Sequence, residues 1–229
     1  MSENRVALVT GASAGLGRAL ALALAERGWR LIITARGGER LGEVRAVTGG
    51  EAVVGDVADV EHRGRVFAAV EAAGRVDLVV NNASALGSSP LPSLERYPLD
   101  ELEDVFRSNV IAPLAILQGT LPMLRDASGV VVNISSDAAV GAYAGWGGYG
   151  ASKAALDQIA TVLAVENPQL RVYSFDPGDM RTEMHQAAFP GEDISDRPEP
   201  ETVVPVLLRL IESRLESGRY IASEWAVRS

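Results

Sequence analysis

A tyrosine and a lysine stand four residues apart in the segment Tyr149-Gly150-Ala151-Ser152-Lys153. At the start of a predicted helix over Tyr149–Glu166, this spacing places both side chains on one face. A tyrosine with an ordinary pKa near ~10 is a slow acid or base at neutral pH, and a neighbouring ammonium favours the phenolate. The pair therefore suits proton exchange with a carbonyl or alcohol oxygen, although the same spacing alone also fits an exposed surface pair.

Other polar residues follow predicted strands. Ser136 stands just after a strand over Val130–Ile134, and Asn81-Asn82-Ala83-Ser84 ends another strand. Open parallel sheets bind ligands at the carboxyl ends of their strands, so the Ser136 hydroxyl is placed to hydrogen-bond a substrate oxygen. Asn109 lies within a long predicted helix, Leu99–Leu124.

A glycine-rich turn separates the first predicted strand, Val6–Thr10, from a helix. Its glycines are Gly11, Gly15 and Gly17, and such a turn lets a pyrophosphate approach the backbone and the helix N-terminus. The same letters also match the G-x-S-x-G nucleophile elbow of hydrolases, with Ser13 as nucleophile and His185 downstream. We disfavour the hydrolase because that elbow normally follows several strands and because it leaves Tyr149 and Lys153 unexplained.

Short apolar runs alternate with longer Ala/Leu-rich stretches, which predicts strands buried on both faces between helices. The fold class is therefore α/β, a single domain over residues 1–229 with a Rossmann-like, doubly wound parallel sheet of about seven strands and helices on both faces. The remaining predicted strands are Leu31–Thr34, Ala52–Val54, Leu78–Asn81, Val172–Phe175 and Tyr220–Ala222. The remaining predicted helices are a stretch from Leu16 to Gly28, Glu39–Val47, Val60–Ala73 and Thr202–Ser217.

Taken together, these residues resemble the short-chain dehydrogenase/reductase superfamily over nearly the whole chain. The motifs appear in the family's order, with the serine thirteen positions before the tyrosine. They are Thr10-Gly11-x-x-x-Gly15-x-Gly17, Asp56, Asn81-Asn82-Ala83, Asn109, Ser136, Tyr149-x-x-x-Lys153 and Pro177-Gly178-x-x-x-Thr182.

The resemblance implies a role for each matching residue. Tyr149 is the general acid in reduction, Lys153 lowers its pKa and holds the nicotinamide ribose, Ser136 polarises the carbonyl, and Asn109 helps hold a water that relays protons. Asp56 accepts a hydrogen bond from the adenine. The implied cofactor contacts are Gly11, Ser13, Ala14, Gly15, Leu16, Gly17, Arg36, Asp56, Val57, Asn82, Ala83, Tyr149, Lys153, Pro177, Gly178 and Thr182.

One position departs from the family. Ser84 stands after Asn-Asn-Ala, where the family usually has glycine. Because serine is small, we expect a modest adjustment of the backbone and no loss of the cofactor.

The end of the second strand bears on the choice of nicotinamide cofactor. NAD-using relatives commonly carry an aspartate near Ala35, but here Arg36 follows, and a guanidinium suits a 2′-phosphate. Ser13 could add a hydroxyl contact, whereas Ala14 stands where many NADP-using relatives have a basic residue. We expect NADP(H), with NAD(H) the alternative.

Composition limits the remaining classes. The formal net charge of −9 disfavours a nucleic-acid partner and an anionic membrane surface. The absence of cysteine removes disulfides and thiolate chemistry, and no cluster has metal-ligand spacing. The N-terminus lacks the pattern of a signal peptide and no apolar run is long enough to span a bilayer, so we expect a cytoplasmic protein.

A few further residues could shape a substrate pocket. Tyr143 and Trp146 lie where the family builds one wall of the pocket, and Asp137 adjoins Ser136. Residues 183–201 are predicted to form a substrate lid, although a solvated loop fits equally well, since the stretch is rich in proline and acid. We expect His62 at the surface of a polar helix and His185 in an exposed loop, with a substrate contact as the alternative for His185.

These features predict an NADPH-dependent ketone or aldehyde reductase acting on a small-molecule substrate. The alternative in another class is a non-catalytic, cofactor-binding regulator on the same fold. The resemblance also implies a homodimer or homotetramer, assembled through the helices Leu99–Leu124 and Tyr149–Glu166.

Overall fold

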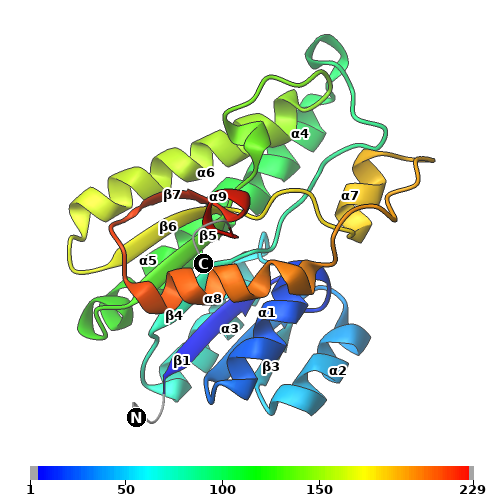
Figure 1. The fold of residues 1–229 in the computed structure, drawn as a ribbon. Helices are drawn as coiled ribbons and strands as arrows, with labels where there is room; N and C mark the ends of the chain where they lie inside the picture. The colour runs from blue at the N-terminus through cyan, green and yellow to red at the C-terminus, as the bar shows by residue number, and fades with distance from the viewer. Residues whose placement is uncertain (1–4, 227–229) are drawn as a thin grey trace.

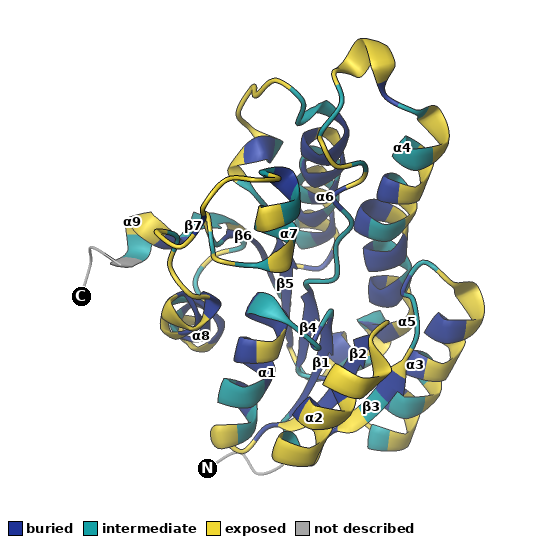
Figure 2. Ribbon diagram, turned by 90° about the vertical axis from the view of Figure 1, so that its right-hand side faces the viewer, coloured by how far each residue is buried: buried dark blue, intermediate teal, exposed yellow. Residues whose placement is uncertain are grey.

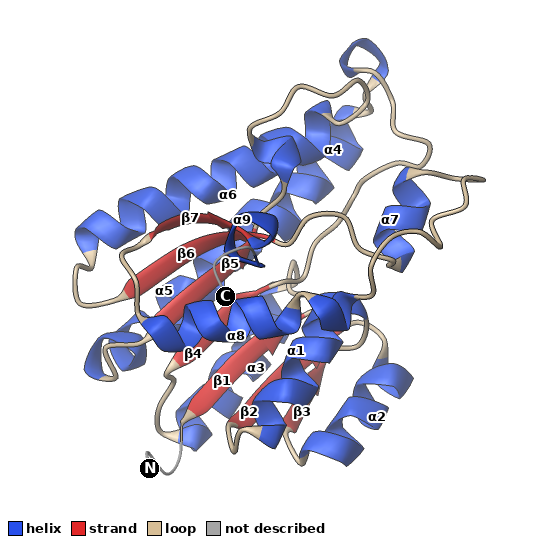
Figure 3. Ribbon diagram, in the orientation of Figure 1, coloured by secondary structure: helices blue, strands red, loops and turns tan. Residues whose placement is uncertain are grey.

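The computed structural model describes residues 5–226, and these form one parallel sheet covered by helices on both sides (Figure 1). The seven strands run in the order β3-β2-β1-β4-β5-β6-β7, and every pairing is parallel (Figure 3). Their bounds are β1 Val6–Thr10, β2 Arg30–Ala35, β3 Glu51–Val54, β4 Leu78–Asn81, β5 Val130–Ile134, β6 Arg171–Asp176 and β7 Gly218–Ile221. The predicted Rossmann-like fold is confirmed.

Helices pack on both faces of this sheet, so the central strands are buried throughout (Figure 2). One apolar layer joins α1, α2 and α8 to the sheet, and the opposite layer joins α3, α5 and α6 to it. This two-sided burial explains why the central strands carry nearly continuous Val, Ile and Leu. The helices are α1 Gly15–Glu26, α2 Gly38–Thr48, α3 Val60–Ala73, α4 Leu99–Phe106, α5 Ala112–Asp126, α6 Gly147–Glu166, α7 Glu183–Ala188, α8 Val204–Ser213 and α9 Ala222–Ala226.

Several predicted elements differ in the structure, most of them by one or two residues at an end. The helix expected over Leu99–Leu124 is divided into α4 and α5 by a π-helical turn at Arg107–Ile111. The helix predicted to reach Ser217 is α8, which ends at Ser213 because Arg214 adopts a left-handed conformation with φ 51°. The last strand ends at Ile221, since Ala222 already begins α9.

The strand order sets the position of the site. The chain moves outward from β1 to β2 and β3, then returns to pair β4 on the other side of β1. At such a switch point the loops after neighbouring strands diverge and leave a crevice at the carboxyl edge of the sheet. Within residues 5–226, no helix has the length and apolar character required to cross a membrane.

Candidate active site

A single long cleft of about 1340 Å³ follows the carboxyl edge of the sheet. It begins at the glycine turn after β1, passes the loops after β2, β3 and β4, and ends beside α6 and α7. Most of the predicted site residues line it: Gly11, Ser13, Ala14, Gly15, Leu16, Arg36, Asp56, Val57, Asn82, Ala83, Ser136, Tyr149, Lys153, Pro177, Gly178 and Thr182. Gly17 and Asn109 are not among the lining residues; Gly17 packs behind Gly11, and Asn109 lies behind Ala85.

The backbone of the glycine turn packs closely against Asn82 in the loop after β4. Gly11 has φ 66°, and a Cβ there would lie 2.7 Å from Asn82 Nδ2, so only glycine fits. The Asn82 amide donates to the carbonyl oxygens of Thr10 at 2.9 Å and Gly11 at 3.2 Å. A Cβ at Gly17 would lie 2.4 Å from the Gly11 carbonyl oxygen, which explains the small residue behind the turn.

The first turn of α1 leaves its backbone donors available. Its N-cap is Ala14, which has no side chain able to accept a hydrogen bond, and the first turn contains no acidic residue. By contrast, α3 is capped by Asp59, whose carboxylate accepts from Glu61 N at 3.0 Å. Free N–H groups facing the cleft at the positive end of a twelve-residue helix suit an anion such as a pyrophosphate.

Two arginines and an aspartate lie at the far end of the cleft. Arg36 has a side chain that is 75% exposed, and its Nη1 lies 4.0 Å from Asp56 Oδ2. Asp56 also accepts from Ala58 N at 2.9 Å, which fixes the turn after β3. Arg40, in the first turn of α2, lines the same end and was not singled out from the sequence. The sequence could have indicated Arg40, because it stands four residues after Arg36 on the helix that begins at Gly38.

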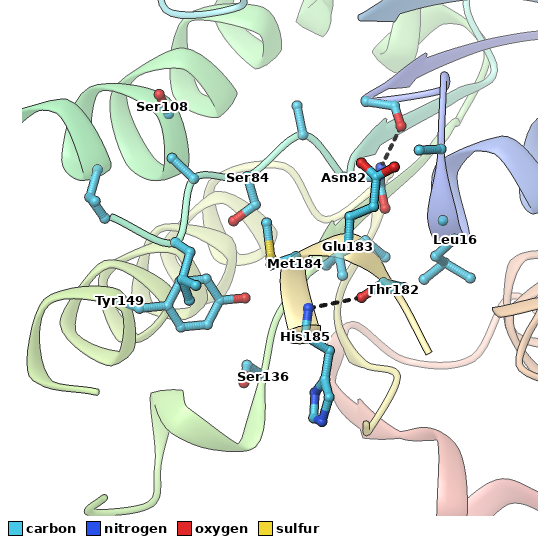
Figure 4. A pocket seen from close by; sticks show the side chains of 18 of the residues that line it. Leu16, Asn82, Ser84, Ser108, Ser136, Tyr149, Thr182, Glu183, Met184 and His185 are labelled. Atoms are coloured by element: carbon cyan, nitrogen blue, oxygen red, sulfur yellow. Dashed lines mark hydrogen bonds between the residues drawn. The ribbon is translucent and has the colours of Figure 1, made fainter. Parts of the chain in front are cut away.

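Tyr149 and Lys153 lie at the opposite end, in the first part of α6. Tyr149 is 8% exposed and Lys153 is 2% exposed, so neither is the surface pair that the spacing alone allowed. Lys153 Nζ donates to the Ile134 carbonyl at the end of β5, over 2.8 Å, and lies 5.4 Å from the centre of the Tyr149 ring. Figure 4 shows the Tyr149 hydroxyl pointing into the cleft on the side of Ser84 and Ser136.

Burial dominates the electrostatics of this pair. Desolvation raises the pKa of Tyr149 to about 12, against a smaller lowering by the nearby Ser84 hydroxyl. Desolvation also lowers the pKa of Lys153 to about 8, against the attraction of Asp157. The Lys153 ammonium faces the Ile134 carbonyl. That Lys153 lowers the pKa of Tyr149 stays a prediction.

Ser136 follows β5 and opens a short 3-10 turn, Asp137–Ala139. Its Oγ accepts from Ala138 N at 3.2 Å and donates to Asp137 Oδ1 at 3.0 Å. The hydroxyl is therefore fixed on the cleft wall, and a rotation about its C–O bond would turn the hydrogen from Asp137 toward a substrate.

Asn109 is buried in the π-helical turn between α4 and α5. Its amide donates to Ala85 O at 2.8 Å and to Ser152 Oγ at 3.0 Å, and its carbonyl accepts from Ala85 N at 2.7 Å. The π turn thus places the Asn109 carboxamide where it hydrogen-bonds both the loop after β4 and α6. Such insertions are frequent at functional sites.

An ion-pair cluster behind the site was missed by sequence reasoning. Arg219 on β7 donates to Ser136 O at 2.8 Å, to Asp176 Oδ2 at 2.9 Å and to Asp157 Oδ2 at 3.2 Å. Asp157 also accepts from Ser135 Oγ at 2.8 Å. Arg219 therefore joins the ends of β5 and β6 to α6, and no local sequence pattern could have paired residues so far apart.

The segment after β6 packs over the open side of the cleft. Gly178 has φ 73°, and Thr182 caps α7 by accepting from His185 N at 3.1 Å (Figure 4). Trp146 packs against both Tyr149 and Phe189, at ring-centre distances of 5.7 and 5.9 Å. Tyr143 also lines the cleft but is half exposed, whereas Trp146 packs against Tyr149.

Both histidines lie elsewhere than predicted. His62 is fully buried, with Nε2 2.7 Å from Thr34 Oγ1, and the prediction of a surface position was wrong. It fills the space beside Gly55, where a Cβ would lie 2.3 Å from His62 Nδ1. His185 belongs to α7, has a side chain only 9% exposed and lines the cleft, so the exposed-loop prediction was also wrong.

The hydrolase alternative has no structural support. Among the described residues neither histidine hydrogen-bonds Ser13: His62 contacts Thr34 and Arg65, and His185 Nδ1 lies 3.8 Å from Asp179 Oδ1. Within residues 5–226, no group of three or more His, Asp or Glu side chains is arranged to hold a metal ion.

The cleft fits a dinucleotide along its whole length. Its uncapped helix end and glycine turn suit a pyrophosphate, its arginine end suits a further anion, and its buried tyrosine and lysine stand at the other end. These complementary regions occur in the order that a nicotinamide dinucleotide requires.

Comparisons with known proteins agree with this geometry. The family model described as short chain dehydrogenase matches residues 5–193. Sepiapterin reductase of Xenopus tropicalis is 34% identical over 93% of this chain and 85% of its own length. Serine 3-dehydrogenase of Rhizobium radiobacter is 35% identical over 77% of this chain and 72% of its own length. A short-chain dehydrogenase structure from Shigella flexneri, complexed with NADP, has a TM-score of 0.89 and 31% identity over 96% of this chain and 98% of its own. The chain belongs to the short-chain dehydrogenase family and is an oxidoreductase of that family.

Proposed function

We propose that this protein is an NADPH-dependent reductase of ketones or aldehydes, with Tyr149 as the general acid. The observation that carries the proposal is the single cleft that joins Arg36 and the glycine turn to Tyr149, Ser136 and Lys153. The NADP-bound relative from Shigella flexneri and an NADPH-bound relative from Escherichia coli support the choice of cofactor.

The nicotinamide would supply a hydride to the carbonyl carbon, and the protein supplies position and a proton. Ser136 turns its hydroxyl hydrogen from Asp137 to the carbonyl oxygen and polarises it. Tyr149 then gives its phenolic proton to the same oxygen as negative charge develops there. In the reverse direction the phenolate takes the proton of the alcohol, so one set of residues serves both directions.

Lys153 and Asn109 would assist these steps by positioning the cofactor and the loop after β4. The Lys153 ammonium is placed by the Ile134 carbonyl, and from there it would hold the nicotinamide ribose. Asn109 links the loop after β4 to α6 through its hydrogen bonds to Ala85 and Ser152. We propose that it also holds the proton-relay water implied by the family resemblance.

We assign the 2′-phosphate of the cofactor to Arg36 and Arg40. Arg36 has only a loose ion pair with Asp56, and Arg40 Nη1 contacts Glu183 Oε1 at 2.6 Å. Both are well exposed, so a phosphate can reach them at little cost in lost protein contacts. Guanidinium groups bind phosphate with two parallel hydrogen bonds.

We propose that residues 183–201 act as a lid over the substrate. Helix α7 packs Met184, Ala188 and Phe189 onto the small apolar cluster that contains Tyr149. The following loop is tied to the segment before α7 by exposed ion pairs, Arg181 with Glu199 and Arg197 with Asp179. Exposed pairs open at little cost, which suits a segment that must admit and release substrate.

Oligomerisation is part of the proposal. Apolar side chains remain exposed on the π turn and α6, namely Ile111, Val162 and Val165. We propose that a second copy of the chain covers them in a homodimer or homotetramer, and light scattering would give the molar mass.

The test of this function is a comparison of NADPH and NADH in a screen of diverse ketones and aldehydes. We expect carbonyl-dependent oxidation of NADPH, with a higher kcat/KM for NADPH than for NADH.

Arg36→Ala should lower kcat/KM for NADPH by about 10- to 100-fold, as expected for a lost charge-assisted contact, and should leave kcat/KM for NADH nearly unchanged. Arg45→Ala, an exposed position on the same helix α2 as Arg40, serves as the control. Higher catalytic efficiency with NADH would contradict the cofactor assignment.

The regulator alternative predicts a different outcome. A cofactor-binding regulator would bind NADPH without oxidising it in the presence of any carbonyl. The buried and complete set of Ser136, Tyr149 and Lys153 favours the enzyme.

A further inference from the structure

Ser84 is the position at which this chain departs from its family, and it lies at the catalytic tyrosine. It lies in the loop that follows β4 and lines the cleft. Figure 4 shows the Ser84 hydroxyl directed toward the end of the Tyr149 side chain, on the opposite side from Ser136. The usual glycine has no atom that could reach this place.

The Ser84 hydroxyl is anchored on a rigid partner. It donates to Asn109 Oδ1 over 3.2 Å. The Asn109 carboxamide is itself fixed by Ala85 and by Ser152, whose Oγ donates to the Tyr149 carbonyl at 2.6 Å. Ser84 is thereby tied through two hydrogen bonds to the same turn of α6 that carries Tyr149.

Several charged groups surround Tyr149, and among the groups that shift its pKa the Ser84 hydroxyl is the one that favours the phenolate. Lys153 on α6 is directed to the Ile134 carbonyl. Asp137 after β5 and Asp176 at the end of β6 both disfavour the phenolate and raise the pKa of Tyr149. His185 on α7 lines the same cleft, with its Nδ1 toward Asp179. Among the groups that shift this pKa, the Ser84 hydroxyl alone lowers it, against a larger effect of burial.

We propose that Ser84 is a positioning residue that holds the Tyr149 hydroxyl and donates to its phenolate, with Asn109 as its anchor. This role rests on the function proposed above. During reduction the Tyr149 O–H bond breaks, its proton moves to the substrate oxygen, and the electron pair stays on the phenolate oxygen. Ser84 then turns its hydroxyl hydrogen from Asn109 Oδ1 to that oxygen. Ser84 keeps its proton throughout, so the step needs no further acid or base.

The kinetic test uses the enzyme with its cofactor and follows alcohol oxidation against pH. Oxidation needs the phenolate, so its rate rises through the pKa of Tyr149. Ser84→Ala and Ser84→Gly remove a hydrogen bond to a charged oxygen and should move that rise to higher pH by about 1 to 2 units. Ser84→Thr keeps the hydroxyl and should restore the wild-type profile. A loss of rate that is equal at every pH would show a merely structural role and overturn the proposal.

A second measurement does not depend on turnover, so a failure of the proposed function is distinguishable from a failure of the Ser84 role. The chain has five tyrosines, and labelling their Cζ atoms with ¹³C gives a Tyr149 resonance that is identified by its loss in Tyr149→Phe. At pH 11, without cofactor or substrate, we expect this resonance to be closer to its neutral position in Ser84→Ala than in the wild type. Ser108→Ala, a serine of the same cleft that Figure 4 places away from Tyr149, should titrate as the wild type does. Equal positions in Ser84→Ala and wild type would overturn the proposal.

Discussion

Lys153 is the single lysine of the chain and also one of its largest fully buried side chains. Its ammonium donates to the Ile134 carbonyl, and burial lowers its pKa to about 8. A buried charge with little compensation costs stability, so a buried lysine in a cleft is a candidate functional residue.

The first prediction concerns the stability cost of this lysine. Lys153→Met should raise the free energy of unfolding at pH 7, because it removes a buried charge without removing volume. An unfolded lysine has a pKa near ~10.4, so between about pH 8 and 10 the unfolded state binds more protons than the folded state. Wild-type stability should therefore rise with pH in this window, and its difference from Lys153→Met should be largest below pH 8 and narrow toward pH 10.

Urea unfolding at pH 7, 8.5 and 10 measures this difference. Because there is one lysine, labelling with ¹⁵N at Nζ gives one side-chain signal whose titration reports the pKa of Lys153 directly. A midpoint at or above pH 10, with no change of the stability difference with pH, would contradict the account.

At the residue scale, sequence motifs indicated Tyr149 and Lys153 as candidate catalytic residues but not the protonation state of their side chains. The four-residue spacing predicted that Tyr149 and Lys153 share a helix face, and both lie in the cleft. It could not predict that burial holds the pKa of Tyr149 at about 12, since desolvation depends on Trp146 and on segments distant in sequence. The burial of His62 escaped prediction for the same reason, because its neighbours Thr34 and Gly55 belong to other elements.

At the scale of elements, β7 does more than extend the sheet. Arg219 lies on it and reaches Ser136, Asp157 and Asp176, which belong to three different segments. The Asp176 side chain is 4% exposed and that of Arg219 is 22% exposed, so the cluster is mostly shielded from water. It joins the ends of β5 and β6, and the residues that follow both strands line the cleft.

The second prediction tests this cluster. Arg219→Met should lower the free energy of unfolding by about 2–4 kcal/mol, less than for a fully buried pair because Arg219 is partly exposed. It should also lower kcat more than cofactor affinity, because Ser136 loses the partner of its carbonyl. Arg27→Met removes an exposed pair with Glu212 and should cost under about 1 kcal/mol in the same urea experiment. Equal effects of the two substitutions would show that the Arg219 cluster is no more than a surface contact.

Elements with a strong local pattern were predicted closely, and those set by tertiary contacts were not. The strands Val6–Thr10 and Leu78–Asn81 and the helix Val60–Ala73 have the expected bounds. The π turn at Asn109 has no local signal, because the carboxamide's partners Ala85 and Ser152 determine it. Helix α7 escaped prediction because it is short and is stabilised by packing on Trp146 and Tyr149.

At the scale of the whole molecule, the sheet order places both ends of the cleft on one edge. The glycine turn joins β1 to α1, and Tyr149 and Ser136 come from α6 and the end of β5 on the other side of the switch point. This arrangement was predictable because alternating buried strands and helices leave few other topologies. The substrate was not predictable, since Trp146, His185 and Phe189 come together only through the packing of α7.

The central claim is that Tyr149 gives its proton to a carbonyl oxygen, and Tyr149→Phe tests it most directly. The substitution removes one hydroxyl from a side chain that remains packed against Trp146. With a carbonyl found in the NADPH screen, we predict that kcat falls by about 10²- to 10⁴-fold, the range of general acid catalysis, while the Kd for NADPH measured by fluorescence changes little. Turnover equal to that of the wild type would contradict the account.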